Sequence, residues 1–169
     1  TIDNQVMNSL REDKEIREFM ELLHSTKESI PDFPADLFRL LVTDQLSSLM
    51  TPDRKGWLID WDRMHYFADQ AKILEMNLDK QSLRRKARAL ILYTMEQIAL
   101  APAPDKIRDI INFLGLLEEI NLKPDLWKCQ NLFYDLYQNI DFYQSLDPDL
   151  APLFYELGKR LGFAIKAAV

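Results

Sequence analysis

Glycine is scarce in this chain, at four of 169 residues. Loops that cradle phosphate and tight catalytic turns rely on glycine, because it adopts positive φ angles without a steric cost. The scarcity therefore argues against glycine-rich nucleotide-binding loops. Cysteine is scarcer still: Cys129 is the single one, which excludes an internal disulfide and suits a reducing compartment. We therefore expect a cytoplasmic protein.

Long apolar runs and a positive net charge are also missing. No stretch approaches the ~20 consecutive apolar residues of a membrane span. The formal net charge of -6 argues against a nucleic acid or an anionic membrane as partner, because phosphate binding needs clustered positive charge. The local exception is a basic run that we interpret as the solvated face of a helix: Arg84, Arg85, Lys86 and Arg88.

Proline is present where apolar runs begin, at Pro34, Pro104, Pro124 and Pro148. It fits the first turn of a helix, since the N–H group that it lacks would be unpaired there. An aspartate follows each of these prolines within two positions, where negative charge meets the positive end of the helix dipole. These four places are therefore predicted helix starts.

Apolar residues recur at three- and four-residue spacing through seven segments, which is typical of helices with one buried face. The expected helices lie from Asp13 to about Leu23, from Pro34 to Met50, over 61–74, 79–100 and 104–120, from Pro124 through Tyr137, and from Pro148 through Ile165. No segment alternates with period two between hairpin turns. We predict an all-α fold, a bundle of about six to seven antiparallel-packed helices without a substantial sheet.

The length of the chain is that of one domain, and a globule of this size buries roughly 70% of its unfolded surface. The hydrophobic content of 47% is enough for a core. We expect residues 1–169 to form a single helical domain. Because the chain starts without methionine at Thr1 and ends at Val169 within an apolar-periodic segment, we expect it to be an excised C-terminal fragment of a longer protein.

One helix face offers candidate metal ligands: Asp62, His65 and Asp69 share a face by three- and four-residue spacing. A histidine between two carboxylates can ligate a metal or relay a proton. The alternative is a solvated helix face, which we favour because a second histidine or a cysteine is missing from the pattern. We therefore expect no bound metal and no cofactor.

Other candidates for catalysis are weak. Glu118 and Glu119 are adjacent, so on a helix they point about 100° apart and do not converge on one substrate. Asp147 and Asp149 are explained by helix capping. Cys129 lies on the apolar face of its helix, where a thiol is inert packing.

The aromatic residues fall mainly in two stretches, near 57–67 and 127–155. Most are expected in the core, and the alternative is an interface, because tryptophan and tyrosine are enriched at the centres of interfaces. Aromatics between 133 and 143 lie on more than one helical face, which favours a surface that another domain covers.

Residues 122–134 read LKPDLWKCQNLFY. This segment resembles the L-x-L-W-x-x-Q-N-x-Y/F element that closes a C-terminal helical domain of unknown function. In bacterial proteins of the glycoside hydrolase family 57 type, that domain follows the catalytic barrel. Residues 19–34 and the helix after them are also similar to it. Most of the resemblance rests on Trp127, Gln130 and Asn131, with Phe133 at the last motif position. Tyr134, which follows it, is a further candidate interface residue.

The resemblance implies a non-catalytic accessory domain, which supports or docks on a missing N-terminal barrel acting on α-glucans or related polysaccharides. The catalytic carboxylates would belong to that barrel, so this chain itself is expected to have no enzymatic activity. Its partner would be the N-terminal catalytic domain of the same chain, with polysaccharide reached through that domain. The alternative is a helical protein–protein interaction module without a carbohydrate role. A third hypothesis, an enzyme centred on Asp62, His65 and Asp69, is the weakest.

Overall fold

The computed structural model describes residues 14, 15, 18, 21, 35–51, 60–73, 78–139, 142 and 148–164. The chain divides into two compact units, Thr1–Asp36 and Leu37–Val169. In the first unit, Lys14 and Glu18 lie in helical conformation and form an exposed ion pair at 3.4 Å. The expectation that residues 1–169 form one domain stays a prediction.

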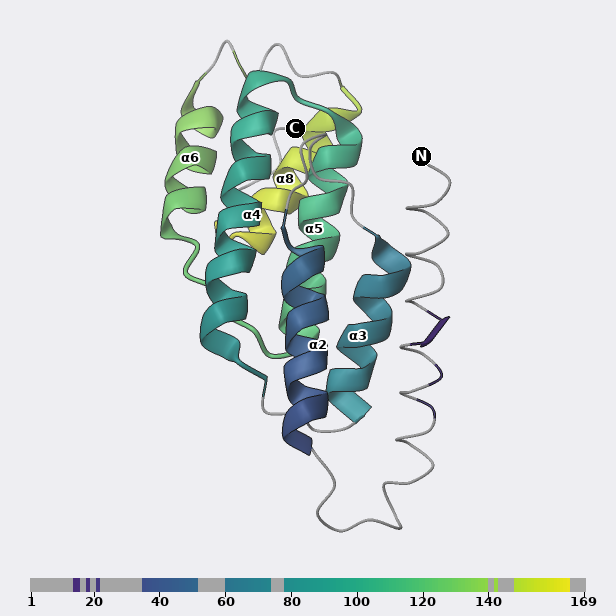
Figure 1. The fold of residues 1–169 in the computed structure, drawn as a ribbon. Helices are drawn as coiled ribbons and strands as arrows, with labels where there is room; N and C mark the ends of the chain where they lie inside the picture. The colour runs from purple at the N-terminus through teal and green to yellow at the C-terminus, as the bar shows by residue number, and fades with distance from the viewer. Residues whose placement is uncertain are drawn as a thin grey trace, which may run out of the picture. The chain divides into compact units, whose positions relative to one another are not determined.

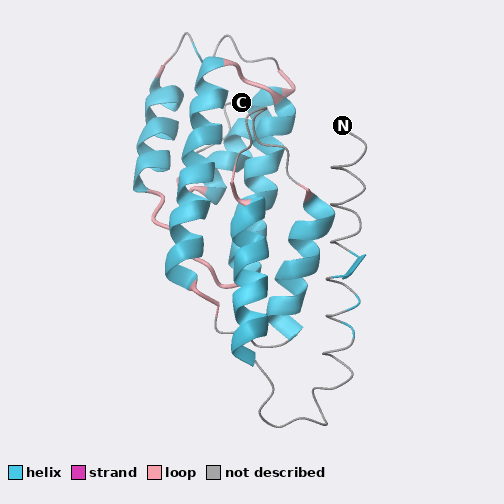
Figure 2. Cartoon of the chain, viewed as in Figure 1, coloured by secondary structure: helices cyan, strands magenta, loops and turns pink. Residues whose placement is uncertain are grey.

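Helices account for all the regular secondary structure in the described ranges, and no strand is found there (Figure 2). The all-α prediction is therefore confirmed. No helix within these ranges combines the length and the apolar character that crossing a membrane requires. Figure 1 shows the six labelled helices: α2 (Ala35–Leu49), α3 (Trp61–Ile73), α4 (Lys80–Leu100), α5 (Pro104–Glu119), α6 (Trp127–Gln138) and α8 (Leu150–Arg160).

Three helices begin where the sequence predicts. The Asp60 carboxylate accepts a hydrogen bond from the backbone N–H of Arg63 at 3.1 Å, just before α3. Asp79 caps α4 in the same way, accepting from the N–H of Ser82 at 3.2 Å. Pro104 is the first residue of α5. Each start satisfies or removes an N–H group that the helix itself leaves without a partner.

Two helices begin later than predicted. α6 begins at Trp127, because the Asp125 carboxylate accepts the backbone N–H of Trp127 at 3.1 Å and holds the preceding residues in a turn. Pro124 therefore lies three residues before the helix. α8 begins at Leu150, and Pro148 lies in the turn before it. In both cases the proline marks the approach to the helix instead of its first turn.

The last helix also ends earlier than its apolar pattern suggested. α8 stops at Arg160, because Gly162 adopts a φ of 91° and the N–H of Phe163 bonds to the Gly158 carbonyl at 2.9 Å. This pattern is a Schellman cap. Asn121 closes α5 in the same way, with a φ of 52° and a bond of 2.8 Å from the Leu122 N–H to the Leu117 carbonyl. The predicted continuation of the helix is wrong for residues 161–164, and Ile165 lies outside the described residues.

The core of the second unit forms around α4 and α5. These two helices are consecutive and antiparallel (Figure 1), and the extensive contacts of α5 with α8 and of α4 with α6 join helices that are not consecutive. The inner face of α4 follows the three- and four-residue spacing of its apolar residues, and the hydroxyl of its one polar member, Thr94, donates to the Leu90 carbonyl at 3.0 Å. The buried residues of that face are Leu83, Ala87, Leu90, Ile91, Thr94, Met95 and Ile98.

Candidate interaction surface

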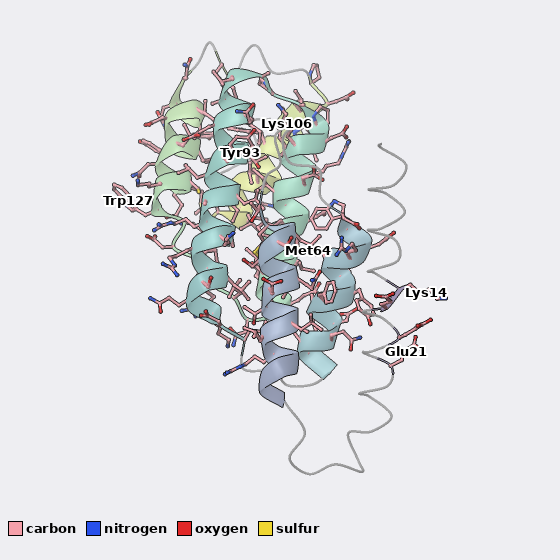
Figure 3. The ribbon with its side chains drawn as sticks, in the orientation of Figure 1. Lys14, Glu21, Met64, Tyr93, Lys106 and Trp127 are labelled. Atoms are coloured by element: carbon pink, nitrogen blue, oxygen red, sulfur yellow. The ribbon has the colours of Figure 1, made fainter. Side chains whose placement is uncertain are left out.

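The two faces of α6 differ sharply. Its inner side is formed by Cys129, Phe133 and Leu136, all buried. On the opposite side, the spacing of four and then three residues brings Trp127, Asn131 and Tyr134 onto one face. Trp127 is 63% exposed and Tyr134 is 52% exposed. Figure 3 shows Trp127 on the outer side of α6, projecting away from the neighbouring helices. We name these three residues the α6 face.

Aromatic packing explains why the helix is oriented in this way. Phe133 stacks on Phe154 of α8, with ring centroids 4.6 Å apart, and its ring also lies 5.2 Å from that of Phe163. Because Phe133 fills the position between α6 and α8, Tyr134, the next residue along the helix, is turned toward solvent. The core interpretation of the aromatics therefore holds for Phe133 and Phe154, whereas Trp127 and Tyr134 belong to the surface.

The two amides of the sequence motif have different environments. Gln130 donates a hydrogen bond from Nε2 to the carbonyl oxygen of Leu161 at 2.8 Å, in a part-buried position. This amide therefore binds the backbone at the end of α8. Asn131 is exposed between the two aromatic side chains, where its amide can donate to and accept from a partner.

A basic row lies on α4 beside the start of α6. Lys80, Arg84 and Arg88 follow one another at four-residue spacing and therefore share one side of α4. Arg88 reaches Asp125, whose carboxylate accepts the backbone N–H of Trp127 just before α6, at 3.8 Å. The predicted solvated face is confirmed, because the whole run from the sequence is exposed: Arg84, Arg85, Lys86 and Arg88.

The three candidate metal ligands on α3 are all exposed. Asp69 pairs with Lys72 at 3.4 Å, and Lys72 also bonds to Glu119 on α5. The ring of His65 lies against that of Trp61, with centroids 5.9 Å apart. In the part of the chain that the structure describes, no three His, Cys, Asp or Glu side chains gather closely enough to hold a metal ion. The face therefore shows an ion-pair link between α3 and α5.

The other titratable candidates serve the packing of helices. Glu118 bonds to Arg160 of α8 at 3.3 Å, whereas Glu119 bonds to Lys72 of α3, so the two adjacent carboxylates diverge as the sequence predicts. The hydrogen bond from Lys72 holds the pKa of Glu119 below its usual value. Burial raises the pKa of the Cys129 thiol to about 11, so the thiol stays protonated at neutral pH and is a poor nucleophile.

Sequence reasoning missed one part-buried polar contact between helices. The indole Nε1 of Trp61 donates to the Asp109 carboxylate at 3.3 Å and links α3 to α5. Burial raises the pKa of Asp109, and the hydrogen bond from Trp61 partly opposes that rise. The sequence did place Asp109 between Ile107 and Ile110, at the edge of the apolar stripe of α5, which indicates a carboxylate that needs a polar partner. Nothing in the sequence, however, indicated which donor would face it.

The comparisons with known proteins add no relative. No family model, no curated protein and no solved structure matches this chain. The likeness of residues 122–134 to the glycoside hydrolase family 57-associated domain therefore rests on its sequence motif alone.

Proposed function

We propose that this chain is a non-catalytic helical domain that binds another protein or domain through the α6 face. The observation that supports this function is the exposure of Trp127 and Tyr134, at 63% and 52%, on one side of a helix whose other side is buried. Large aromatic side chains on a surface carry much of the binding energy in protein interfaces, because they bury a large area at a low cost in conformational entropy.

The arrangement of the α6 face favours a docking surface over two isolated exposed aromatics. Trp127 and Tyr134 are held by a helix that is fixed from its inner side by Phe133, so little ordering is needed on binding. Asn131 between them supplies hydrogen-bonding groups. The other large exposed apolar residues of the described ranges, Leu40 and Leu100, lie singly on α2 and α4, as is common on protein surfaces.

The sequence resemblance supplies the first candidate partner. It is the catalytic barrel of a bacterial glycoside hydrolase family 57-like protein, with this chain as its cytoplasmic accessory domain. Trp127, Asn131 and Tyr134 are then the docking residues, and Gln130 has a structural role. A partner without a carbohydrate role is the alternative, and the exposed α6 face supports both candidates equally.

Site-specific photo-crosslinking tests the proposed function. A photoreactive amino acid replaces Asn131 in the chain as produced in its own host, and a second variant carries it at Asp105, an exposed residue of α5. We expect a discrete crosslinked partner from position 131 and none from position 105. Combining the Asn131 probe with Trp127→Ala and Tyr134→Ala should abolish the product, because both anchoring side chains are then lost.

The identity of the crosslinked partner separates the two candidates. A carbohydrate-active barrel supports the accessory domain, and a different protein supports the alternative. Crosslinking that is equal from both probe positions, or that survives the double alanine substitution, would refute docking through the α6 face. The isolated chain should also release no reducing ends from soluble starch, and measurable hydrolysis would contradict a non-catalytic domain.

A further inference from the structure

The basic row of α4 is the strongest feature that the proposed function leaves unexplained. Five of the 21 lysines and arginines of the chain lie between positions 80 and 88, and the first acidic residue of α4 is Glu96. The chain as a whole carries more acidic than basic residues, 27 against 21. This local reversal of sign therefore needs a cause other than overall composition.

Helix stability does not supply that cause. Lys80, Arg84 and Arg88 are separated by four residues, and like charges at this spacing destabilise a helix by roughly 0.2–0.5 kcal/mol per pair. Lys80 also lies in the first turn, where the helix dipole disfavours a cation. Arg84 and Arg85 form no ion pair with any residue that the structure describes. The row thus lowers the stability of the helix. Arg84 of the row and its neighbour Arg85 are available to an external anion.

The one ion pair of the row connects it to the α6 face. Arg88 lies 3.8 Å from Asp125, and both side chains are exposed, at 46% and 71%. Such a long and solvated contact contributes little, so the carboxylate of a partner can replace it. Asp125 also accepts the backbone N–H of Trp127. Asp125 therefore links the row to the first residue of α6, whose side chain is the exposed indole.

We propose that the partner docking on the α6 face is an acidic protein segment, whose carboxylates bind Arg84, Arg85 and Arg88 while an apolar side chain contacts Trp127. This inference rests on the proposed function and names the chemistry of the partner. The row extends about 12 Å along α4, at 1.5 Å per residue, which is the length of a few residues of an extended segment. Arginine suits this task because its planar fork binds carboxylates in a bidentate manner.

Charge distribution favours a protein segment over a nucleic acid or a membrane. The exposed carboxylates of Asp125 and Asp135 lie beside and along α6, where a continuous phosphate backbone would meet them. The net charge of -6 repels a long polyanion more strongly than a short segment with a few carboxylates, because the repulsion grows with the charge of the partner. A short acidic segment, in contrast, can place its carboxylates on the row and an apolar residue on the indole.

Fluorescence anisotropy with defined probes tests the proposal on the full chain. The first probe is a labelled peptide built from Glu, Asp, Leu and Phe. The second is the same peptide with Gln and Asn in place of its acidic residues. Labelled oligothymidine and phosphatidylserine vesicles represent the other two partner classes. We expect the acidic peptide to bind at low salt, to bind less tightly as salt is raised, and to bind more tightly than the other three probes.

Two matched double variants locate the site. Arg84→Glu with Arg85→Glu removes the free guanidinium groups, and Lys106→Glu with Arg108→Glu makes the same change on α5. Each pair takes the net charge from -6 to -10, since each substitution removes one positive charge and adds one negative charge. We expect the first pair to weaken binding about tenfold, the equivalent of two or more lost ion pairs, and the second to change it by less than about twofold. Circular dichroism confirms that both variants are folded.

The outcomes separate this inference from the proposed function. Equal binding of the acidic and amide peptides, equal weakening by both double variants, no binding of the acidic peptide, or tighter binding of oligothymidine or vesicles would each overturn the acidic partner. Docking through the α6 face would then still stand if the Asn131 crosslink is lost on substitution of Trp127 and Tyr134. If that crosslink survives the substitutions, the proposed function fails whichever peptide binds.

Discussion

Gln130 of α6 donates a hydrogen bond from its side-chain Nε2 to the main-chain carbonyl of Leu161, the residue that follows the last residue of α8, at 2.8 Å. The last four carbonyl groups of a helix lack partners within the helix, and a buried carbonyl without a partner is costly. Gln130 thus fixes the end of α8 to α6. The contact links two helices that are not consecutive in the chain.

Replacing Gln130 with leucine should lower the free energy of unfolding by about 1–3 kcal/mol, because the part-buried Leu161 carbonyl loses its donor. Urea denaturation followed by circular dichroism measures this change. Asn131→Leu is the matched control, since Asn131 is exposed and should change stability by less than about 0.5 kcal/mol. Equal effects of the two substitutions would show that the Gln130–Leu161 bond does not stabilise the fold.

Truncation of the adjacent residues Phe133 and Tyr134 to alanine should change stability by very different amounts. Phe133→Ala should lower the free energy of unfolding by about 3–5 kcal/mol, because it removes a fully buried ring that stacks on Phe154. Tyr134→Ala should change it by less than about 0.5 kcal/mol, since the side chain is 52% exposed. The same denaturation experiment measures both. A large loss of stability in Tyr134→Ala would mean that the α6 face is part of the core.

Two glycines provide a test of backbone conformation. Gly162 adopts a φ of 91° in the cap of α8, so Gly162→Ala should lower the free energy of unfolding by about 1–2 kcal/mol. Gly115 lies inside α5, and a Cβ added there meets nothing within 4 Å. Gly115→Ala should therefore raise the free energy of unfolding by about 0.5–1 kcal/mol, through the better helix propensity of alanine. Thermal unfolding tests whether Gly162→Ala is less stable, and Gly115→Ala more stable, than the unaltered chain.

Periodicity was sufficient to predict the helices and their inner faces, but not to place every helix end. The inner face of α4 follows from spacing alone, because one helix repeat decides which side chains are buried together. The start of α6 depended on a local competition between a turn and the first turn of the helix. At Asp125 the side chain bonds to the backbone two residues on, which favours a turn over a first helical turn after Pro124. The end of α8 depended on Gly162, whose positive φ the apolar pattern does not reveal.

The surface of α6 was predictable only in part. The motif residues Trp127, Gln130 and Asn131 were identified from the sequence. The position of α8 decides which aromatic residues of α6 are buried, because Phe133 stacks on Phe154 of that helix. This stacking is a contact between residues far apart in the sequence, which helical spacing does not predict. The ion pair between Arg88 and Asp125 was not predicted for the same reason.

The Asp109 carboxyl should make stability depend on pH. Burial raises its pKa in the folded state, so the folded chain binds this proton more tightly than the unfolded chain does. The stabilising contribution of the protonated form is complete below the unfolded pKa of about 3.8, and it is lost as pH rises through the folded pKa. The free energy of unfolding of Asp109→Asn relative to the unaltered chain should therefore increase as pH rises from the acid range to neutral.

The hydrogen bond from Trp61 provides the control for this pH dependence. Asparagine at position 109 keeps an oxygen that accepts from the indole Nε1, so Asp109→Asn removes the charge and retains the contact. Trp61→Phe removes the donor that lowers the pKa of Asp109, and should steepen the loss of stability toward neutral pH. When position 109 is already asparagine, the effect of Trp61→Phe on the free energy of unfolding should no longer depend on pH, because no carboxylate remains at that position. Urea denaturation of the four proteins across the acid range measures the cycle, and a pH-independent difference between the unaltered chain and Asp109→Asn would contradict the prediction.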